Sequence, residues 1–206
     1  MKSVSALIAL FLLVSGSPAL GEAPIRFEHL TINDGLLENS VRAIIQDQTG
    51  FLWFATQNGV ARYDGIWMKT YLPDPGDNGS IDIRFVLSMA EDDTGSIWMG
   101  SYSGGVSVFD SVLERFTNFT PGEGFPGPGL ASICPAEDGV WMTSTSGGLY
   151  RAVGHEFEQI PGPPLRPYDG RGLTGLDVTT REILVGSSRN GVAHLDRTSN
   201  SWSHFS

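Results

Sequence analysis

The side chains in this sequence that could do chemistry are a few histidines and a set of recurring aspartates. His29, His155, His194 and His204 are far apart, and no His-x-x-x-His or Cys-x-x-Cys pair is present. Protein metal sites usually include such closely spaced ligands, so we predict no metal and no cofactor. The runs rich in serine and glycine also lack the spacing of a nucleophile elbow or a phosphate loop. We therefore expect no catalytic residue and no enzyme activity in this chain.

The aspartates have a structural interpretation. Asp47 and Asp92 open two similar tetrads, DQTG at 47–50 and DDTG at 92–95. Aspartate at the first position and glycine at the fourth are typical of a type I turn, where the carboxylate accepts backbone N–H bonds. An aspartate that recurs at the same turn is expected to accept the same backbone hydrogen bonds in each repeat. We predict that these aspartates shape turns rather than catalyse a reaction.

These turns belong to a repeat that runs through the whole chain. Three tryptophans and then Leu184 follow one another at steps of 45, 43 and 43 residues, and a series of glycines steps by 46, 43 and 43. Periods of this length with strand-like content are typical of β-propeller blades. The positions that carry the repeat are Asp47, Gly50, Trp53, Gly59, Asp92, Gly95, Trp98, Gly105, Trp141, Gly148 and Gly191.

The predicted fold is all-β, with blades of four antiparallel strands. We expect four blades, at about 39–71, 83–119, 129–160 and 175–205, and a leading strand at 26–30. The leading strand has no blade here to complete, so we expect an incomplete part of a larger propeller of about seven blades. Wedges between blades need large side chains, and all five tryptophans are therefore predicted to lie in the core.

The N-terminus predicts export. Residues 1–21 have the layout of a signal peptide, with Lys2, an apolar run and a small-residue stretch, which leaves 22–206 as the mature chain. No apolar run of 18 residues follows, so membrane attachment would need a segment downstream. A net charge of −10 argues against nucleic acid as a partner. Cys134 is the only cysteine, which excludes an internal disulfide, and we expect it to be buried in a strand.

A ligand, if one binds, is expected at a mouth of the propeller, where loops gather. The longest such loop, at 161–173, contains Arg166, Tyr168 and Arg171. Arginine with tyrosine suits an anionic or sugar-like molecule, and an ordinary exposed loop is the alternative. We therefore name these three residues as candidates for binding an unidentified small molecule or glycan.

Several of these motifs together resemble the opening of the two-component regulator propeller proteins. They are FEHL at 27–30, DGL at 34–36, NSV at 39–41, the pattern Asp47-x-x-Gly50-x-x-Trp53, and GVARYDG at 59–65. The resemblance covers the mature chain, but it weakens along it, and TTRE at 179–182 replaces the turn motif in the fourth repeat.

The resemblance implies a sensing role. In that family the propeller is the periplasmic sensor of a membrane-spanning protein, followed by an immunoglobulin-like module, a transmembrane helix and a cytoplasmic histidine kinase or diguanylate cyclase. It also implies a homodimer in the full-length sensor. A different class remains open, because the Asp-x-x-Gly-x-x-Trp pattern resembles the aspartate boxes of sialidases. The alternatives are therefore a histidine kinase sensor, a diguanylate cyclase sensor, and a free-standing secreted binding or carbohydrate-active propeller.

Overall fold

The computed structural model describes residues 27–121, 125, 127, 129–162, 172–188 and 190–205. Within these ranges, sixteen strands form four antiparallel sheets of four, each paired in chain order. We call the sheets blades 1 to 4. Blade 1 holds β1 (Val41–Gln46), β2 (Leu52–Thr56), β3 (Gly59–Tyr63) and β4 (Met68–Tyr71); blade 2 holds β5 (Val86–Glu91), β6 (Ile97–Ser101), β7 (Val106–Asp110) and β8 (Arg115–Phe119); blade 3 holds β9 (Leu130–Ala136), β10 (Gly139–Ser144), β11 (Leu149–Val153) and β12 (Glu156–Ile160); blade 4 holds β13 (Leu173–Val178), β14 (Glu182–Ser187), β15 (Val192–Asp196) and β16 (Ser201–Phe205).

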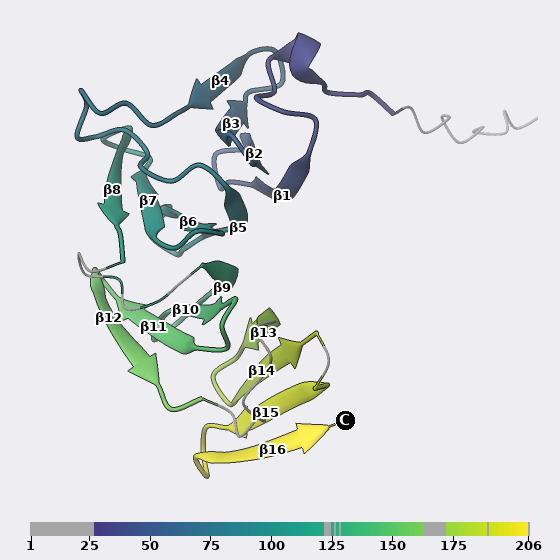
Figure 1. Ribbon diagram of the computed structural model, residues 1–206, viewed down its shortest axis with the longest axis vertical. Helices are drawn as coiled ribbons and strands as arrows, with labels where there is room; N and C mark the ends of the chain where they lie inside the picture. Colours follow the sequence, from purple (N-terminus) through teal and green to yellow (C-terminus); the bar gives the residue numbers. More distant parts are fainter. Residues whose placement is uncertain are drawn as a thin grey trace, which may run out of the picture.

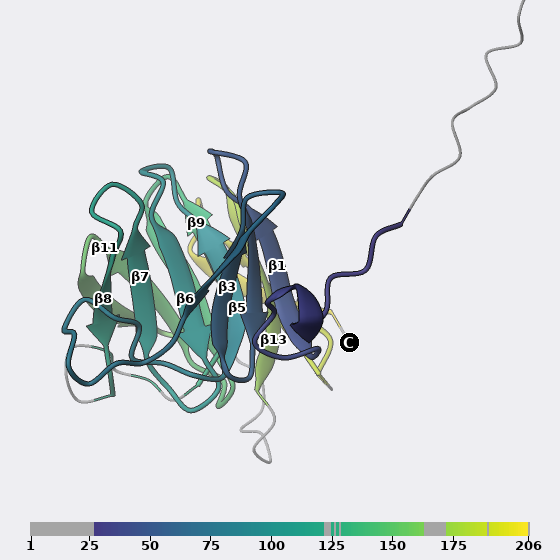
Figure 2. The ribbon, with the colours of Figure 1, turned by 90° about the horizontal axis from the view of Figure 1, so that it is seen from above.

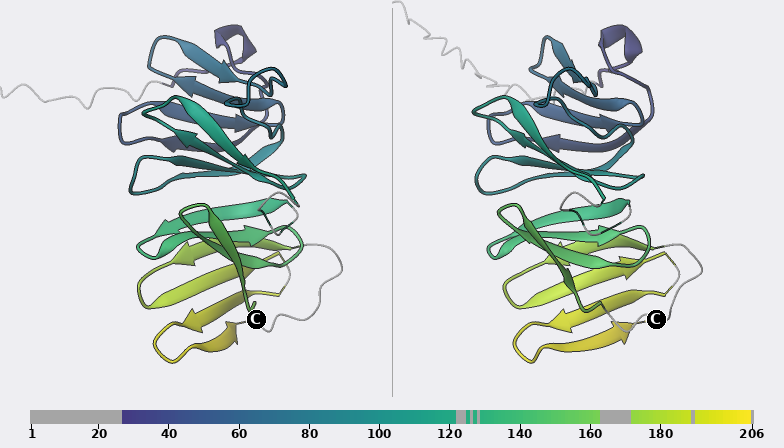
Figure 3. Two further views of the ribbon diagram at one scale, coloured as in Figure 1. Left: turned by 90° about the vertical axis from the view of Figure 1, so that its left-hand side faces the viewer. Right: turned by 60° about the vertical axis from the view of Figure 1, so that its left-hand side comes forward.

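The blades stand side by side in an open arc (Figure 1). The first strands β1, β5, β9 and β13 line the inner side and contact one another in turn, whereas β8, β12 and β16 lie on the outer side. The two side views show the sheets stacked in chain order (Figure 3). Blades 1 and 4 lie at opposite ends of the arc. The predicted all-β fold, an incomplete propeller with four-stranded blades, is confirmed.

Each interface between consecutive blades has its own apolar core. Trp53 of blade 1 packs with Phe109 of blade 2, Trp98 of blade 2 with Val140 of blade 3, and Trp141 of blade 3 with Leu195 of blade 4. The second strand of blade 2 is enclosed between two sheets, and every residue of β6 is buried. Strands buried on both faces read as continuous apolar runs rather than alternating ones, which is the pattern of IWMGS in β6.

The tryptophans do not all lie in the core as predicted. Trp53, Trp98 and Trp141 are buried, but Trp67 is 76% exposed and the prediction for it is wrong. Trp67 lies in the turn before β4, and the inward-facing aromatic of that strand is Tyr71, whose ring stacks on Trp53 with centroids 5.5 Å apart. Residues four apart share one face of a continuous strand, but β4 begins at Met68, so Trp67 lies outside the sheet and does not pack in the core. The fifth tryptophan, Trp202 in β16, is partly buried.

The predicted leading strand at 26–30 is also wrong over its described part, since residues 27–30 form no strand and Phe27 is 82% exposed. A strand needs a neighbouring edge for its backbone bonds, and blade 4 lies at the far end of the arc. The chain instead enters a 3-10 helix, η1 (Ile32–Asp34), whose capping box begins at Thr31. Figure 2 looks onto blade 1 and shows η1 in front of it.

The same segment covers the free face of blade 1. Leu36, after η1, is buried there against Phe54 and Ala61, with Leu30 beside them. The predicted signal peptide, residues 1–21, lies outside the described residues. Among the residues that are described, no helix is long and apolar enough to span a bilayer.

Candidate functional site

The turn aspartate of blade 1 holds both a turn and a tryptophan. One carboxylate oxygen of Asp47 accepts hydrogen bonds from the backbone N–H of Thr49 and of Phe51, both at 3.0 Å, and from the Thr49 hydroxyl at 2.6 Å. The other oxygen accepts the indole N–H of the fully buried Trp53 at 2.7 Å. Gly50 closes the turn at φ +96°, a conformation that glycine adopts without strain. The carboxylate therefore fixes the hairpin and the core ring together.

Blade 2 repeats this arrangement. Asp92 accepts the N–H groups of Thr94 (2.9 Å) and Ser96 (3.0 Å) and the indole N–H of Trp98 (2.7 Å), and Gly95 closes the turn at φ +81°. Burial alone raises the pKa of a carboxyl, but the hydrogen bonds to Asp92 outweigh it and lower its pKa, as they do for Asp47. Both side chains are therefore ionised at neutral pH.

The sequence interpretation missed these aspartate to indole bonds. The signal was present, because Asp47 and Asp92 each precede their tryptophan by six residues. In blade 3 the spacing shortens to three residues, and Asp138 still accepts the Trp141 indole N–H at 3.1 Å. The fourth blade has leucine at this position and keeps no such pair.

An arginine covers the core tryptophan at the interface of blades 1 and 2 and pairs with a carboxylate of blade 2. Arg62, opposite Trp53 on β3, places its guanidinium 4.7 Å from the ring centre of Phe51 and 5.6 Å from that of Trp53. It also pairs with Glu114 of blade 2 at 2.9 Å. Guanidinium groups stack favourably on aromatic faces and form directional pairs with carboxylates.

At the interface of blades 3 and 4, two arginines cover the core tryptophan and pair with a carboxylate. Arg151, opposite Trp141 on β11, lies 5.4 Å from the tryptophan ring centre, and Arg197 of blade 4 lies 5.5 Å from it. Both arginines pair with one oxygen of Asp138, Arg151 at 2.8 Å. Burial opposes ionisation of Asp138, but hydrogen bonds from Trp141 and Arg151 and the charge of Arg197 lower its pKa.

The interface of blades 2 and 3 has a cavity whose surroundings differ from those of the two other interfaces. Val108 is the residue opposite Trp98, so no guanidinium covers this ring from β7. Ala152 occupies the position that Phe109 holds in blade 2 and Leu195 in blade 4, each next to its apolar partner on the second strand. Val108 and Ala152 are thus smaller than the residues at the equivalent positions of the other blades. Both line a cavity of about 440 Å³ at this interface.

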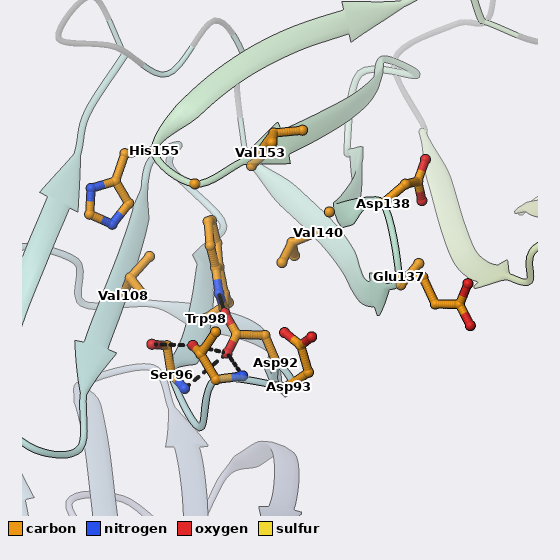
Figure 4. A pocket seen from close by; sticks show the side chains of 15 residues that line it. Asp92, Asp93, Ser96, Trp98, Val108, Glu137, Asp138, Val140, Val153 and His155 are labelled. Carbon is orange, nitrogen blue, oxygen red and sulfur yellow. Dashed lines mark hydrogen bonds between the residues drawn. The ribbon is translucent and has the colours of Figure 1, made fainter.

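The cavity has an apolar floor and an acidic rim (Figure 4). The floor is formed by the buried side chains of Trp98, Val108, Val140 and Ala152. The rim carries four carboxylates and an imidazole, from Asp92, Asp93, Glu137, Asp138 and His155. No lysine or arginine is among the described residues that line it. Asp93 and Glu137 are exposed and form no ion pair with any other described residue.

A second cavity of about 460 Å³ lies beside the Asp138 turn, between blades 3 and 4. Arg197 lines it and pairs with Asp138, so the arginine supplies a cation there. The two cavities are neighbours at the same end of the blades, but only the one between blades 2 and 3 has a rim without a basic side chain.

The other predicted residues are dispersed. Arg166, Tyr168 and Arg171 lie outside the described residues. His194 contacts Glu182 at 2.9 Å. Nowhere in the described ranges do three potential ligands gather as a metal site. Cys134 lies in β9 and is partly exposed rather than fully buried.

Known proteins resemble this chain in both sequence and fold. Residues 35–58 match the family model described as two component regulator propeller. Histidine kinase P4 of Formosa agariphila is 42% identical over 55 residues, which are 27% of this chain and 4% of that protein. The extracellular domain of a B. thetaiotaomicron protein described as a hybrid two component system superimposes with a TM-score of 0.74 at 21% identity, over 87% of this chain and 26% of that one.

A second extracellular domain from B. thetaiotaomicron, also described as part of a hybrid two component system, gives a TM-score of 0.50 at 18% identity over 80% of this chain and 27% of its own. The chain thus spans about a quarter of these structures. The family match falls on β1, β2 and the turn that Asp47 locks to Trp53. The chain is therefore a stretch of β-propeller in which residues 35–58 match the two-component regulator propeller repeat.

Proposed function

We propose that this chain is the extracytoplasmic, ligand-sensing part of a signal-transduction protein, and that it serves a histidine kinase encoded downstream. The observation that carries the proposal is the family match at residues 35–58, because it includes the turn and the core ring that blade 2 repeats. The stretch shared with Histidine kinase P4 favours a kinase over a cyclase as the output domain.

In this proposal the chain senses and does not catalyse. Residues 1–21 direct export, the mature chain lies in the periplasm, and a segment after Ser206 anchors it to the membrane. The ligand is a small molecule or glycan, and the full-length sensor is a homodimer. These points follow from the resemblance and from the N-terminal sequence.

Export is tested by fusing alkaline phosphatase after Ser206, since this enzyme is active only where its disulfides can form. We expect activity from the fusion that includes residues 1–21 and none from a matched fusion that begins at Glu22. Equal activity of the two fusions, or none from either, would overturn the assignment to the periplasm.

The output domain is tested on the full-length protein in membranes. Phosphate transfer from ATP to a histidine supports the kinase, whereas formation of cyclic di-GMP contradicts it in favour of a diguanylate cyclase. Deleting residues 22–206 should abolish any change of the phosphate-transfer rate on addition of small molecules or glycans, while the rate without them stays measurable. A gene that stops soon after Ser206 would contradict the sensor and favour a free-standing secreted propeller.

A further inference from the structure

We propose that the cavity between blades 2 and 3 binds a small organic cation, a guanidinium group on a short alkyl stem. The bound cation would occupy the place that an arginine of the chain itself takes in each flanking interface. This proposal goes beyond the sensor function, because binding can be measured whether or not the chain serves a kinase.

The first argument is the equivalence of positions. In each of the first three blades one residue of the third strand pairs directly with the core tryptophan of the second strand. That residue is Arg62 in blade 1 and Arg151 in blade 3, and both guanidinium groups lie over the ring. In blade 2 it is Val108. The middle interface thus keeps the ring but lacks the cation.

The second argument is space. Ala152 stands where a phenylalanine or a leucine fills the other interfaces, which adds an apolar volume next to Val108. The floor of Trp98, Val108, Val140 and Ala152 suits an alkyl stem, since burying methylene groups on such a surface is favourable. A cavity of about 440 Å³ lies within the range of ordinary small-molecule sites.

The third argument is charge. Asp92 lies below Trp98 and already accepts four hydrogen bonds within its own turn. Asp93 lies beside it at the opening, and Glu137 lines the edge of the cavity with its carboxylate extending away from Trp98 (Figure 4). Asp138 contributes little, because Arg151 and Arg197 already pair with it. Around an apolar floor, unpaired carboxylates and an aromatic face together favour a cation that can stack and donate hydrogen bonds. A guanidinium does both, and the two flanking interfaces each have a guanidinium over the tryptophan ring.

The test compares two probes of nearly equal shape, N-butylguanidinium and the neutral N-butylurea, titrated into the purified chain by calorimetry. We expect saturable 1:1 binding of butylguanidinium, and binding of butylurea at least about tenfold weaker, since both probes donate N–H bonds to carboxylates but only the guanidinium adds a positive charge. No saturable binding of butylguanidinium would overturn the proposal. Equal binding of the two probes would also overturn it, because the cavity would then be merely apolar.

Variants locate the site. Val108→Arg should supply the missing guanidinium and weaken butylguanidinium binding at least about tenfold. Val112→Arg is the matched control, because Val112 is 88% exposed in a turn of the same blade, and it should change binding less than about twofold. Undiminished binding by Val108→Arg, with a retained cooperative thermal transition, would contradict the proposal.

Two further variants keep the test decisive if Val108→Arg does not fold. Ala152→Leu copies the residue of blade 4 and should weaken binding by filling the floor. Asp93→Asn combined with Glu137→Gln changes only exposed side chains and should weaken binding about fivefold, with a smaller salt dependence than the parent chain. If neither variant weakens binding, the cation is held elsewhere and the assignment to this cavity is wrong.

Discussion

Replacing Asp47 by asparagine is expected to lower the free energy of unfolding by about 3 kcal/mol. One carboxylate oxygen serves Thr49 and Phe51 and the other serves the indole of Trp53. An asparagine side chain keeps only one acceptor oxygen, so in either orientation its NH2 group faces a donor. The indole is fully buried and has no access to water. A hydrogen bond to a charged group contributes about 1.5–3 kcal/mol, and a buried donor left unpaired costs about 1–3 kcal/mol.

Urea unfolding at pH 7, followed by tryptophan fluorescence, measures the loss. The matched control is Asp110→Asn, because Asp110 accepts the N–H groups of Val112 and Leu113 in an exposed turn with no indole involved, and it should cost less than about 1 kcal/mol. A double-mutant cycle with Trp53→Phe should give a coupling of about 1.5 kcal/mol. The reasoning is refuted if Asp47→Asn costs no more than the control, or if the coupling is zero.

Two other properties follow from lowered and raised pKa values. The pKa values of Asp47 and Asp92 are lowered in the folded state, so the unfolded chain binds more protons at acid pH, and the free energy of unfolding should be constant above about pH 5 and fall as the pH drops below about 4. Urea titrations between pH 3 and 7 check this, and a flat profile would contradict it. Burial raises the pKa of the Cys134 thiol, so labelling by a disulfide reagent at pH 7.5 should be at least about tenfold slower in the folded chain than in urea. Equal labelling rates would show that the thiol is not protected.

The four-sheet architecture could be predicted because the same turn and the same core ring recur at a nearly constant period. Glycine after aspartate sets the first hairpin, and a tryptophan on the next strand marks the face toward the following blade. These features are local, so a linear sequence displays them. Leu184 breaks the pattern in blade 4, where Gly186, Gly191 and Asp196 still keep the register of the repeat.

What could not be predicted depends on register and on distant partners. Trp67 and Tyr71 are four residues apart and would share one face of a longer strand, but β4 begins only at Met68 and leaves Trp67 in the preceding turn. The segment 27–30 lacks a neighbouring edge in the arc, which no local pattern reveals. The cavity arises from Val108 and Ala152, which belong to different blades and whose truncation is visible only when equivalent strand positions are compared. The candidates Arg166, Tyr168 and Arg171 stay predictions.

The open arc has a mechanical consequence. The main contacts between blades join consecutive ones, so the chain behaves as a one-dimensional array whose stability is a sum of blade terms and nearest-neighbour terms. The junction of blades 2 and 3 differs from the other two in that no guanidinium covers its core tryptophan. In such an array a change at one junction acts first on the two blades that share it. A molecule bound in the cavity between blades 2 and 3 would contact both blades, and it would therefore restrict their motion relative to each other.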